Sequence, residues 1–234
     1  MSSPPLDSTD PDYEHSALLF LNGQYALRYL DERAGLQVKW LAPEAVRAAF
    51  SRIGVDSGWL PPEVRRWGHT PRGEYAVMFV PAQKHTLRLV NTWEGRVPSK
   101  RLLKIDVPLP ALVFAGIGTT YCLWACRTVP RPEAAAHVAP LPNVGRDGHI
   151  CFGDNHPPSA GPDTLTQAWK IFMSSPFNDH LIGDASRAYP RDVREQLLAL
   201  AESRADTYPV DDLVRYRTGT IHEAVQQMLA SGER

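Results

Sequence analysis

The feature that most constrains the fold is a long uncharged stretch, VPLPALVFAGIGTTYCLWAC, which runs from Val107 to Cys126. It has about the length of a transmembrane helix, roughly 20 residues. However, it contains two prolines, two glycines and two threonines, and Gly116-Ile117-Gly118 divides it into two strand-sized pieces. We therefore predict a buried β-hairpin at the centre of the fold and no membrane span.

The residues before this hairpin predict two groups of strands separated by a helix. Asn22-Gly23 is a hairpin turn signal between residues 16–21 and 24–31, and residues 35–41 continue as a third strand. Residues 42–54 have helical spacing, with Pro43 at the start and Gly54 at the end. Further expected elements are a loop over 58–73, strands over 74–82 and 85–91, a polar connection over 92–101, and a strand over 102–107.

The residues after the hairpin predict an extended flap followed by helices. We expect a first helix over 163–175, capped by Asp163 or Thr164, and a second that begins near Pro190. A third helix is expected over 218–231. Strands followed by helices indicate an α+β fold with an antiparallel sheet.

Composition excludes several classes of function. The formal net charge is −1, so no overall field draws the chain to nucleic acid or to an anionic membrane. Residues 1–16 are polar and predict a disordered tail without a signal peptide. The chain has 3 cysteines, which cannot all pair with one another, so we expect reduced thiols and a cytoplasmic location.

Two of the cysteines are expected to be packing residues in the core and not reactive or metal-binding groups. Cys122 and Cys126 share one face of a predicted strand, and the chain has no Cys-x-x-Cys pair. We interpret both as small buried hydrophobic residues and expect no metal site. No phosphate-binding glycine motif is present either, so no bound nucleotide is expected.

Cys151 stands apart because turn-forming residues border it on both sides. In PLPNVGRDGHIC, residues 140–151, it follows Asn143 by eight positions. It could be a packing residue, a metal ligand or a nucleophile. His149 and His156 lie close in sequence, and an imidazolium lowers the pKa of a thiol. The Asn143 amide could stabilise an oxyanion formed at the sulfur.

At this point the motif resembles that of ubiquitin-conjugating enzymes. Those enzymes carry His-Pro-Asn, and their active cysteine follows the Asn by eight residues after a Gly-x-Ile step. Pro142-Asn143 and Gly148-His149-Ile150-Cys151 match that pattern, whereas Leu141 stands where the family has His. A closer resemblance, to the bacterial prokaryotic ubiquitin-conjugating family D (PRTRC system protein B), covers about Leu18 to Leu181. It is carried by YAVMFVPAQKHTLRL, VPLPALVFAG, CRTVPRP, APLPNVGRDGHICFGD and WKIFMSSPFNDH.

This resemblance implies a ubiquitin-conjugating-enzyme-like fold: an antiparallel sheet, an active-site flap, C-terminal helices and an N-terminal strand and helix extension. Residues 17–234 would form a single domain with an N-terminal elaboration at about 17–60. The operons of such proteins also encode a ubiquitin-like protein, an activating enzyme and a JAB-type peptidase, and some related operons act in antiphage defence. Cys151 would accept the ubiquitin-like protein as a thioester and pass it to an amine of a target protein.

The resemblance implies further roles for residues near the flap. Asn143 would support the oxyanion, and no cofactor would be needed because the activating enzyme uses the ATP. Two alternatives remain open, an inactive scaffold that binds a ubiquitin-like partner and a cysteine hydrolase that uses His149 or His156. The remaining candidates are the general bases Asp154, His156 and Asp179, and His137 and His149 as structural substitutes for the missing His.

Overall fold

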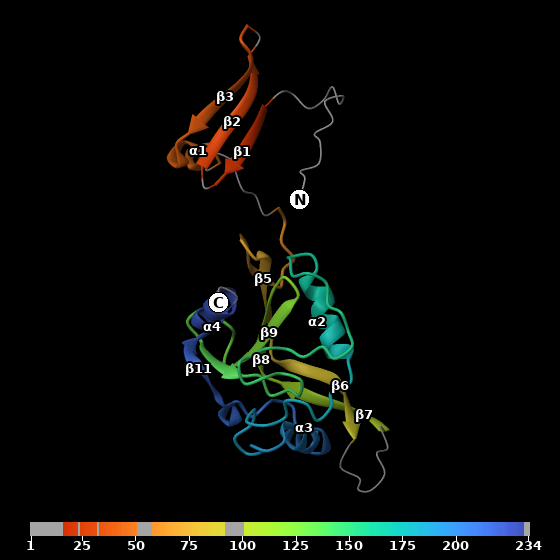
Figure 1. The fold of residues 1–234 in the computed structure, drawn as a ribbon. Helices are drawn as coiled ribbons and strands as arrows, with labels where there is room; N and C mark the ends of the chain where they lie inside the picture. The colour runs from red at the N-terminus through yellow and green to blue at the C-terminus, as the bar shows by residue number, and fades with distance from the viewer. Residues whose placement is uncertain (1–15, 23, 32, 51–57, 92–100, 232–234) are drawn as a thin grey trace. The chain divides into compact units, whose positions relative to one another are not determined.

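The computed structural model describes residues 16–22, 24–31, 33–50, 58–91 and 101–231 (Figure 1). These residues divide into two compact units, Met1–Ser57 and Gly58–Arg234, and each unit is described by itself. Residues 1–15 of the predicted tail, the end of the first predicted helix and the polar connection at 92–100 lie outside the described residues. Ser16, the last residue of the predicted tail, begins the first strand.

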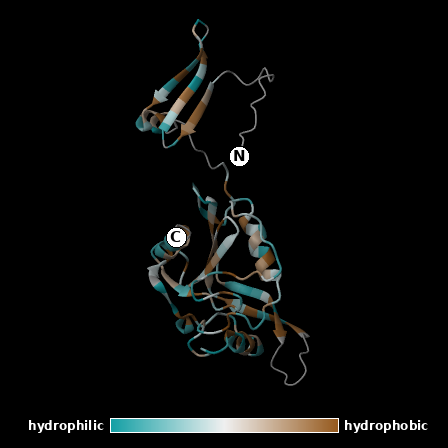
Figure 2. Ribbon diagram, in the orientation of Figure 1, coloured by the Kyte–Doolittle hydropathy of each residue, from teal (hydrophilic) through white to brown (hydrophobic). Residues whose placement is uncertain are grey.

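The N-terminal unit is a three-stranded antiparallel sheet of β1 (Ser16–Leu21), β2 (Gln24–Asp31) and β3 (Gly35–Leu41), in that order. Asn22 has a positive φ of 50°, and the predicted hairpin and third strand are confirmed. Helix α1 (Pro43–Phe50) contacts β2. Figure 2 shows hydrophobic stretches along these strands.

The second unit contains a six-stranded sheet and a separate two-stranded ribbon, all antiparallel. The strand order of the six-stranded sheet is β11-β10-β9-β8-β5-β4, and the ribbon pairs β6 with β7. The bounds are β4 (Val64–Thr70), β5 (Gly73–Val80), β6 (Gln83–Asn91), β7 (Arg101–Leu109), β8 (Ala111–Ile117), β9 (Thr120–Cys126), β10 (Ala135–Val138) and β11 (Arg215–Thr220).

The central hairpin of β8 and β9 is confirmed, and every residue of β8 is buried. Along β9 the side chains alternate between two cores. Tyr121, Leu123 and Ala125 join the core that includes α2 (Leu165–Ser174). Trp124 lies in the core that includes α4 (Ile221–Ala230). Helices therefore cover both faces of the sheet, as Figure 1 shows, and the charge-free sequence reflects burial on both sides. Among the described residues, no helix is long and apolar enough to span a membrane.

The loop predicted at 58–73 is wrong, because residues 64–70 within it form β4. Gly68 and the neighbouring prolines obscured the strand pattern. The ring of Tyr75 on the paired strand packs over this glycine, since a Cβ at this position would lie 2.6 Å from it. Strands β10 and β11 were not predicted either. The two are short and irregularly paired, so their pattern is weak.

The predicted helices exist, with corrected starts. Helix α3 (Val193–Glu202) begins later than Pro190, because the side chain of Asp192 caps it by accepting from the Arg194 N–H. Thr164 occupies the N-cap of α2 as predicted, but its hydroxyl makes no capping bond. The first residues of the third predicted helix belong to β11, and Thr220 caps α4.

Candidate active site

The eight-residue spacing between Asn143 and Cys151 closes a short antiparallel hairpin. Val144 and Ile150 form its bridge. The Cys151 N–H donates to the Asn143 carbonyl at 2.8 Å. In an antiparallel ladder, residues at equal distances on either side of a bridge lie opposite one another. Asn143 therefore lies directly opposite Cys151, and the spacing is a consequence of main-chain pairing.

Glycine is required at the turn of this hairpin. Gly148 has φ 84°, a region that residues with a side chain rarely adopt. A Cβ there would also lie 2.6 Å from Nε1 of Trp124 in the core. The carboxylate of Asp147 accepts from the His149 N–H at 3.0 Å and stabilises the turn. The chain can thus reverse direction against the sheet only with glycine at this position.

The cysteine side of the hairpin is attached to the edge of β9. The Leu123 N–H donates to the Gly148 carbonyl at 2.8 Å, and the Ile150 N–H donates to the Tyr121 carbonyl at 2.9 Å. Cys151 is the next residue along the chain, partly exposed. The following residue, Phe152, packs against the Tyr121 ring at 5.5 Å between centroids. Cys151 therefore lies beside β9 between two packed neighbours, Ile150 and Phe152.

The three thiols differ in their surroundings. Burial raises the pKa of Cys126 to about 12. Burial, with a smaller effect of the Asp147 carboxylate, raises the pKa of Cys122 to about 12. Both pack in the same core, which confirms their interpretation as small hydrophobic residues. Among the described residues, no three His, Cys, Asp or Glu side chains are grouped so that they could hold a metal ion. Cys151 is therefore the thiol that is open to chemistry.

Asn143 is held in a tightly defined position. It has a positive φ of 62° and is only 7% exposed. Its backbone N–H donates to the His180 carbonyl at 2.9 Å, and its side-chain Nδ2 donates to the Pro176 carbonyl at 3.5 Å. Its Oδ1 is buried and has no partner among the described residues. Both of these carbonyls come from one segment, Ser175–His180, which we call the clasp segment.

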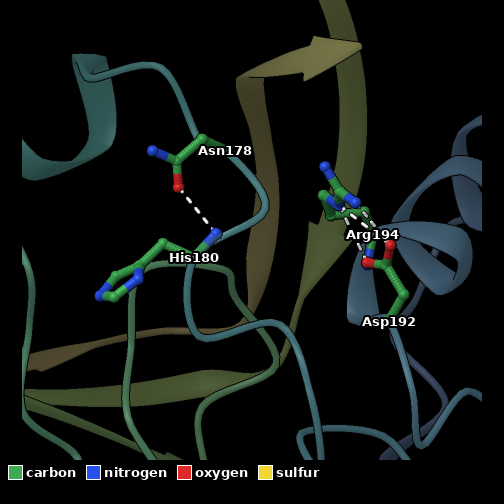
Figure 3. A network of polar contacts seen from close by, with 4 residues as sticks. All are labelled: Asn178, His180, Asp192 and Arg194. Carbon is green, nitrogen blue, oxygen red and sulfur yellow. Dashed lines mark hydrogen bonds and ion pairs between the residues drawn. The ribbon is translucent and has the colours of Figure 1, made fainter. Parts of the chain in front are cut away.

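The clasp segment is itself anchored on the second unit. Phe177 is fully buried, and its backbone bonds to β6 through Arg88 and Val90 at 2.7 Å each. The Asn178 Oδ1 accepts from the His180 N–H at 2.9 Å, as Figure 3 shows. The clasp segment thus joins the ribbon of β6 and β7 to the hairpin that carries Cys151.

A buried ion pair lies on the chain beyond the clasp segment. At the start of α3, Asp192 and Arg194 pair with Oδ2 and Nη2 2.7 Å apart, also shown in Figure 3. The backbone of Val193 bonds to the Ile182 carbonyl at 2.9 Å. The chain just after the clasp segment is therefore bonded to the start of α3.

Leu141, which stands where the family motif has His, is a core residue. It is fully buried in the core that includes α2. The imidazole of the motif is thus replaced here by apolar packing. The described hydrogen bonds of Asn143 are made by the clasp segment and by Cys151, and none involves His137 or His149.

The other candidates from the sequence are spread around the hairpin. His137 is buried in β10, where its Nδ1 is paired with the Ala135 carbonyl at 3.0 Å. Burial lowers its pKa, with smaller effects of hydrogen bonds and nearby charges. The exposed residues are His149 in the hairpin, Asp154 and His156 in the loop after Cys151, and Asp179 in the clasp segment.

The sequence interpretation missed Asn155. Its backbone N–H and its Nδ2 both donate to the Phe152 carbonyl, at 3.2 Å and 3.0 Å. The same Nδ2 donates to the Ser175 hydroxyl at 3.1 Å. Asn in a loop between glycine and proline is a turn former, and that local signal was present in the sequence.

Residues 38–216, more than half of the chain, match the sequence profile of prokaryotic E2 family D. The chain belongs to prokaryotic E2 family D. The matched range includes the hairpin, Cys151 and the clasp segment, and membership confirms the resemblance seen in the sequence. Membership in a family of E2 (ubiquitin-conjugating) proteins links the chain to ubiquitin-like conjugation at the family level. No curated protein and no solved structure matches the chain significantly.

Proposed function

We propose that the chain is a conjugating transferase for a ubiquitin-like protein and that Cys151 carries the tag as a thioester. The observation that supports this most strongly is the pairing of Asn143 with Cys151 across the hairpin, within a chain of the E2 family. The contrast between one partly exposed thiol and two buried ones supports the same residue.

In the first transfer, the thiolate of Cys151 attacks the carbonyl carbon of the thioester that joins the tag to the activating enzyme. A new carbon–sulfur bond forms, and the bond to the activating enzyme's sulfur breaks, so that its thiolate leaves. The intermediate carries a negative oxygen. Asn143 lies opposite Cys151 in the hairpin, and we propose that the Nδ2 hydrogen not given to the Pro176 carbonyl stabilises that oxygen.

In the second transfer, a neutral amine of the target attacks the thioester on Cys151. A carbon–nitrogen bond forms, the Cys151 thiolate leaves, and the nitrogen loses a proton to a base. Of the three candidate bases, Asp179 belongs to the clasp segment, next to His180, whose carbonyl binds Asn143. Asp154 and His156 follow Cys151 in the loop. We propose that the base is one of these three exposed residues.

These transfers need no metal or nucleotide in the chain itself, since the thioester already stores the energy of the ATP used by the activating enzyme. The partners are then a ubiquitin-like protein, an activating enzyme and a target protein. The proposed setting is an antiphage defence or plasmid operon in the bacterial cytoplasm.

The decisive test mixes the chain with a cognate activating enzyme, its ubiquitin-like protein and ATP. We expect an adduct that thiol reductant removes and that Cys151→Ala abolishes. Cys151→Ser should give an adduct that resists reductant, because an oxyester replaces the thioester. Cys126→Ala is the matched control, because it removes a buried thiol and should leave the adduct intact.

Other outcomes contradict the proposal. The proposal would be refuted if the chain formed no adduct with an activating enzyme that already carries the tag as a thioester. Tag binding without an adduct would indicate a scaffold, and release of the tag from a finished conjugate by the chain alone would indicate a hydrolase.

A further inference from the structure

The side chain of Asn155 joins the loop that follows Cys151 to the clasp segment. Its Nδ2 bridges the Phe152 carbonyl at 3.0 Å and the Ser175 hydroxyl at 3.1 Å. Phe152 directly follows Cys151, and Ser175 directly precedes Pro176, whose carbonyl binds Asn143. The bridge therefore connects the reactive thiol and its amide partner by a second route, besides the hairpin.

The direction of these hydrogen bonds is fixed by chemistry. The Ser175 hydroxyl donates its single hydrogen to the Ile171 carbonyl at 2.6 Å, so it can only accept from Asn155. The Phe152 carbonyl can only accept as well. An amide NH2 has two hydrogens, and both acceptors are satisfied only when Nδ2 faces them. Both hydrogens of the Asn155 amide are thus used in holding the loop.

We infer that Asn155 is a positioning residue that sets the place of Cys151 relative to Asn143 by tying the cysteine loop to the clasp segment. The inference rests on the proposed function of Cys151. The competing explanation is that Asn155 only forms a local turn through Phe152. A local turn does not need Ser175, which lies 20 residues away in sequence. Removal of the Ser175 hydroxyl therefore separates the two explanations.

The chain offers a matched control for that substitution. Ser175 and Ser203 are the C-cap residues of α2 and α3, and each hydroxyl donates to a carbonyl of its own helix. Only Ser175 also accepts from Asn155. Ser203→Ala thus reproduces the loss of the helix contact without any change at the cysteine loop.

The experiment compares Asn155→Ala, Ser175→Ala, the double variant and Ser203→Ala in the full chain. The first readout is the rate of alkylation of Cys151 by a small neutral reagent under native conditions. Cys122 and Cys126 are buried, with pKa values of about 12, and do not compete. We expect alkylation to accelerate several-fold in both single variants. The double variant should react no faster than Asn155→Ala, and Ser203→Ala should match the wild type.

The second readout is single-turnover transfer of the tag. We expect the maximal rate to fall roughly 10- to 100-fold in Asn155→Ala, because a thiol displaced by about 1 Å loses its alignment. The half-saturating concentration of the activating enzyme loaded with the tag should not change. A general loss of folding would lower the melting temperature and the amount of active protein instead.

Wild-type alkylation rates in both single variants would overturn the inference, and so would an effect of Asn155→Ala that Ser175→Ala does not share. Failure of the wild-type chain to form any adduct would refute the proposed function alone. The alkylation series would still decide whether Asn155 positions Cys151.

Discussion

Restoring the family's motif histidine with Leu141→His should destabilise the protein and should not improve the site. Leu141 is fully buried in the core beside α2, and the described contacts of Asn143 do not depend on it. An imidazole in this place loses apolar packing and brings two ring nitrogens into an apolar core. We therefore expect the substitution to act first on stability.

The expected cost follows from these two effects. Replacing a fully buried leucine removes roughly 2 kcal/mol of apolar burial. A buried polar group without a partner costs about 1–3 kcal/mol more. The sum is roughly 3–5 kcal/mol, a large part of the 5–15 kcal/mol that stabilises typical proteins. Leu141→Met keeps the volume and should cost less than about 1.5 kcal/mol.

The assay is urea unfolding of the full-length variants, followed by tryptophan fluorescence. We expect a lower midpoint for Leu141→His with an unchanged slope, which indicates a change of stability alone. The loss of unfolding free energy should grow below about pH 6.5, because the imidazole then binds a proton in the unfolded chain but not in the buried core. Above that pH, the imidazole is neutral in both states and only the packing cost remains.

Stability of Leu141→His equal to that of the wild type would refute this reasoning. It would mean that the imidazole finds a hydrogen-bond partner, and the unpaired Oδ1 of Asn143 is an acceptor two residues along the chain. In that case the position of residue 141 would accommodate an imidazole, and apolar packing would not be a requirement there.

Three further perturbations test the supports of the site. Asp192→Asn removes the carboxylate that pairs with buried Arg194, which should cost about 3 kcal/mol or more in urea unfolding. Burial lowers the pKa of His85, whose Nε2 has no described partner. The free energy of unfolding of the wild type should therefore decrease as the pH falls below about 6.5, and His85→Phe should reduce that pH dependence. Gly148→Ala combines positive φ with a clash at Trp124, so it should cost at least about 2 kcal/mol and increase the alkylation of Cys151.

The sequence could predict those parts of the fold that depend on local pattern. The uncharged hairpin, the Asn22 turn and the helices α2 and α4 each have a periodic or capping signal within a few residues. Strand β10 has no such signal. It is a strand because it pairs with β9 and with β11, which lies far away in sequence. Such long-range pairing cannot be read from a local window.

The same division applies to the site. Cys151 and Asn143 could be proposed as candidates from the sequence because their spacing, which corresponds to a hairpin in the structure, lies within one short segment. The clasp segment could not be found, because its contacts with Asn143 are made by carbonyl groups, and every residue type carries a carbonyl. Asn155 was missed for a related reason: its partner Ser175 is distant in sequence, although the residue itself is a recognisable turn former.

The geometry also explains how the site can hold its shape without the motif histidine. The register of Asn143 against Cys151 is set by main-chain bonds to each other, to β9 and to the clasp segment. A side-chain change at Leu141 leaves those bonds in place as long as the core remains packed. The tightest requirements therefore fall on backbone conformation, above all at Gly148. The side chains that matter most should be those that link segments, such as Asn155, rather than the residue at the motif's first position.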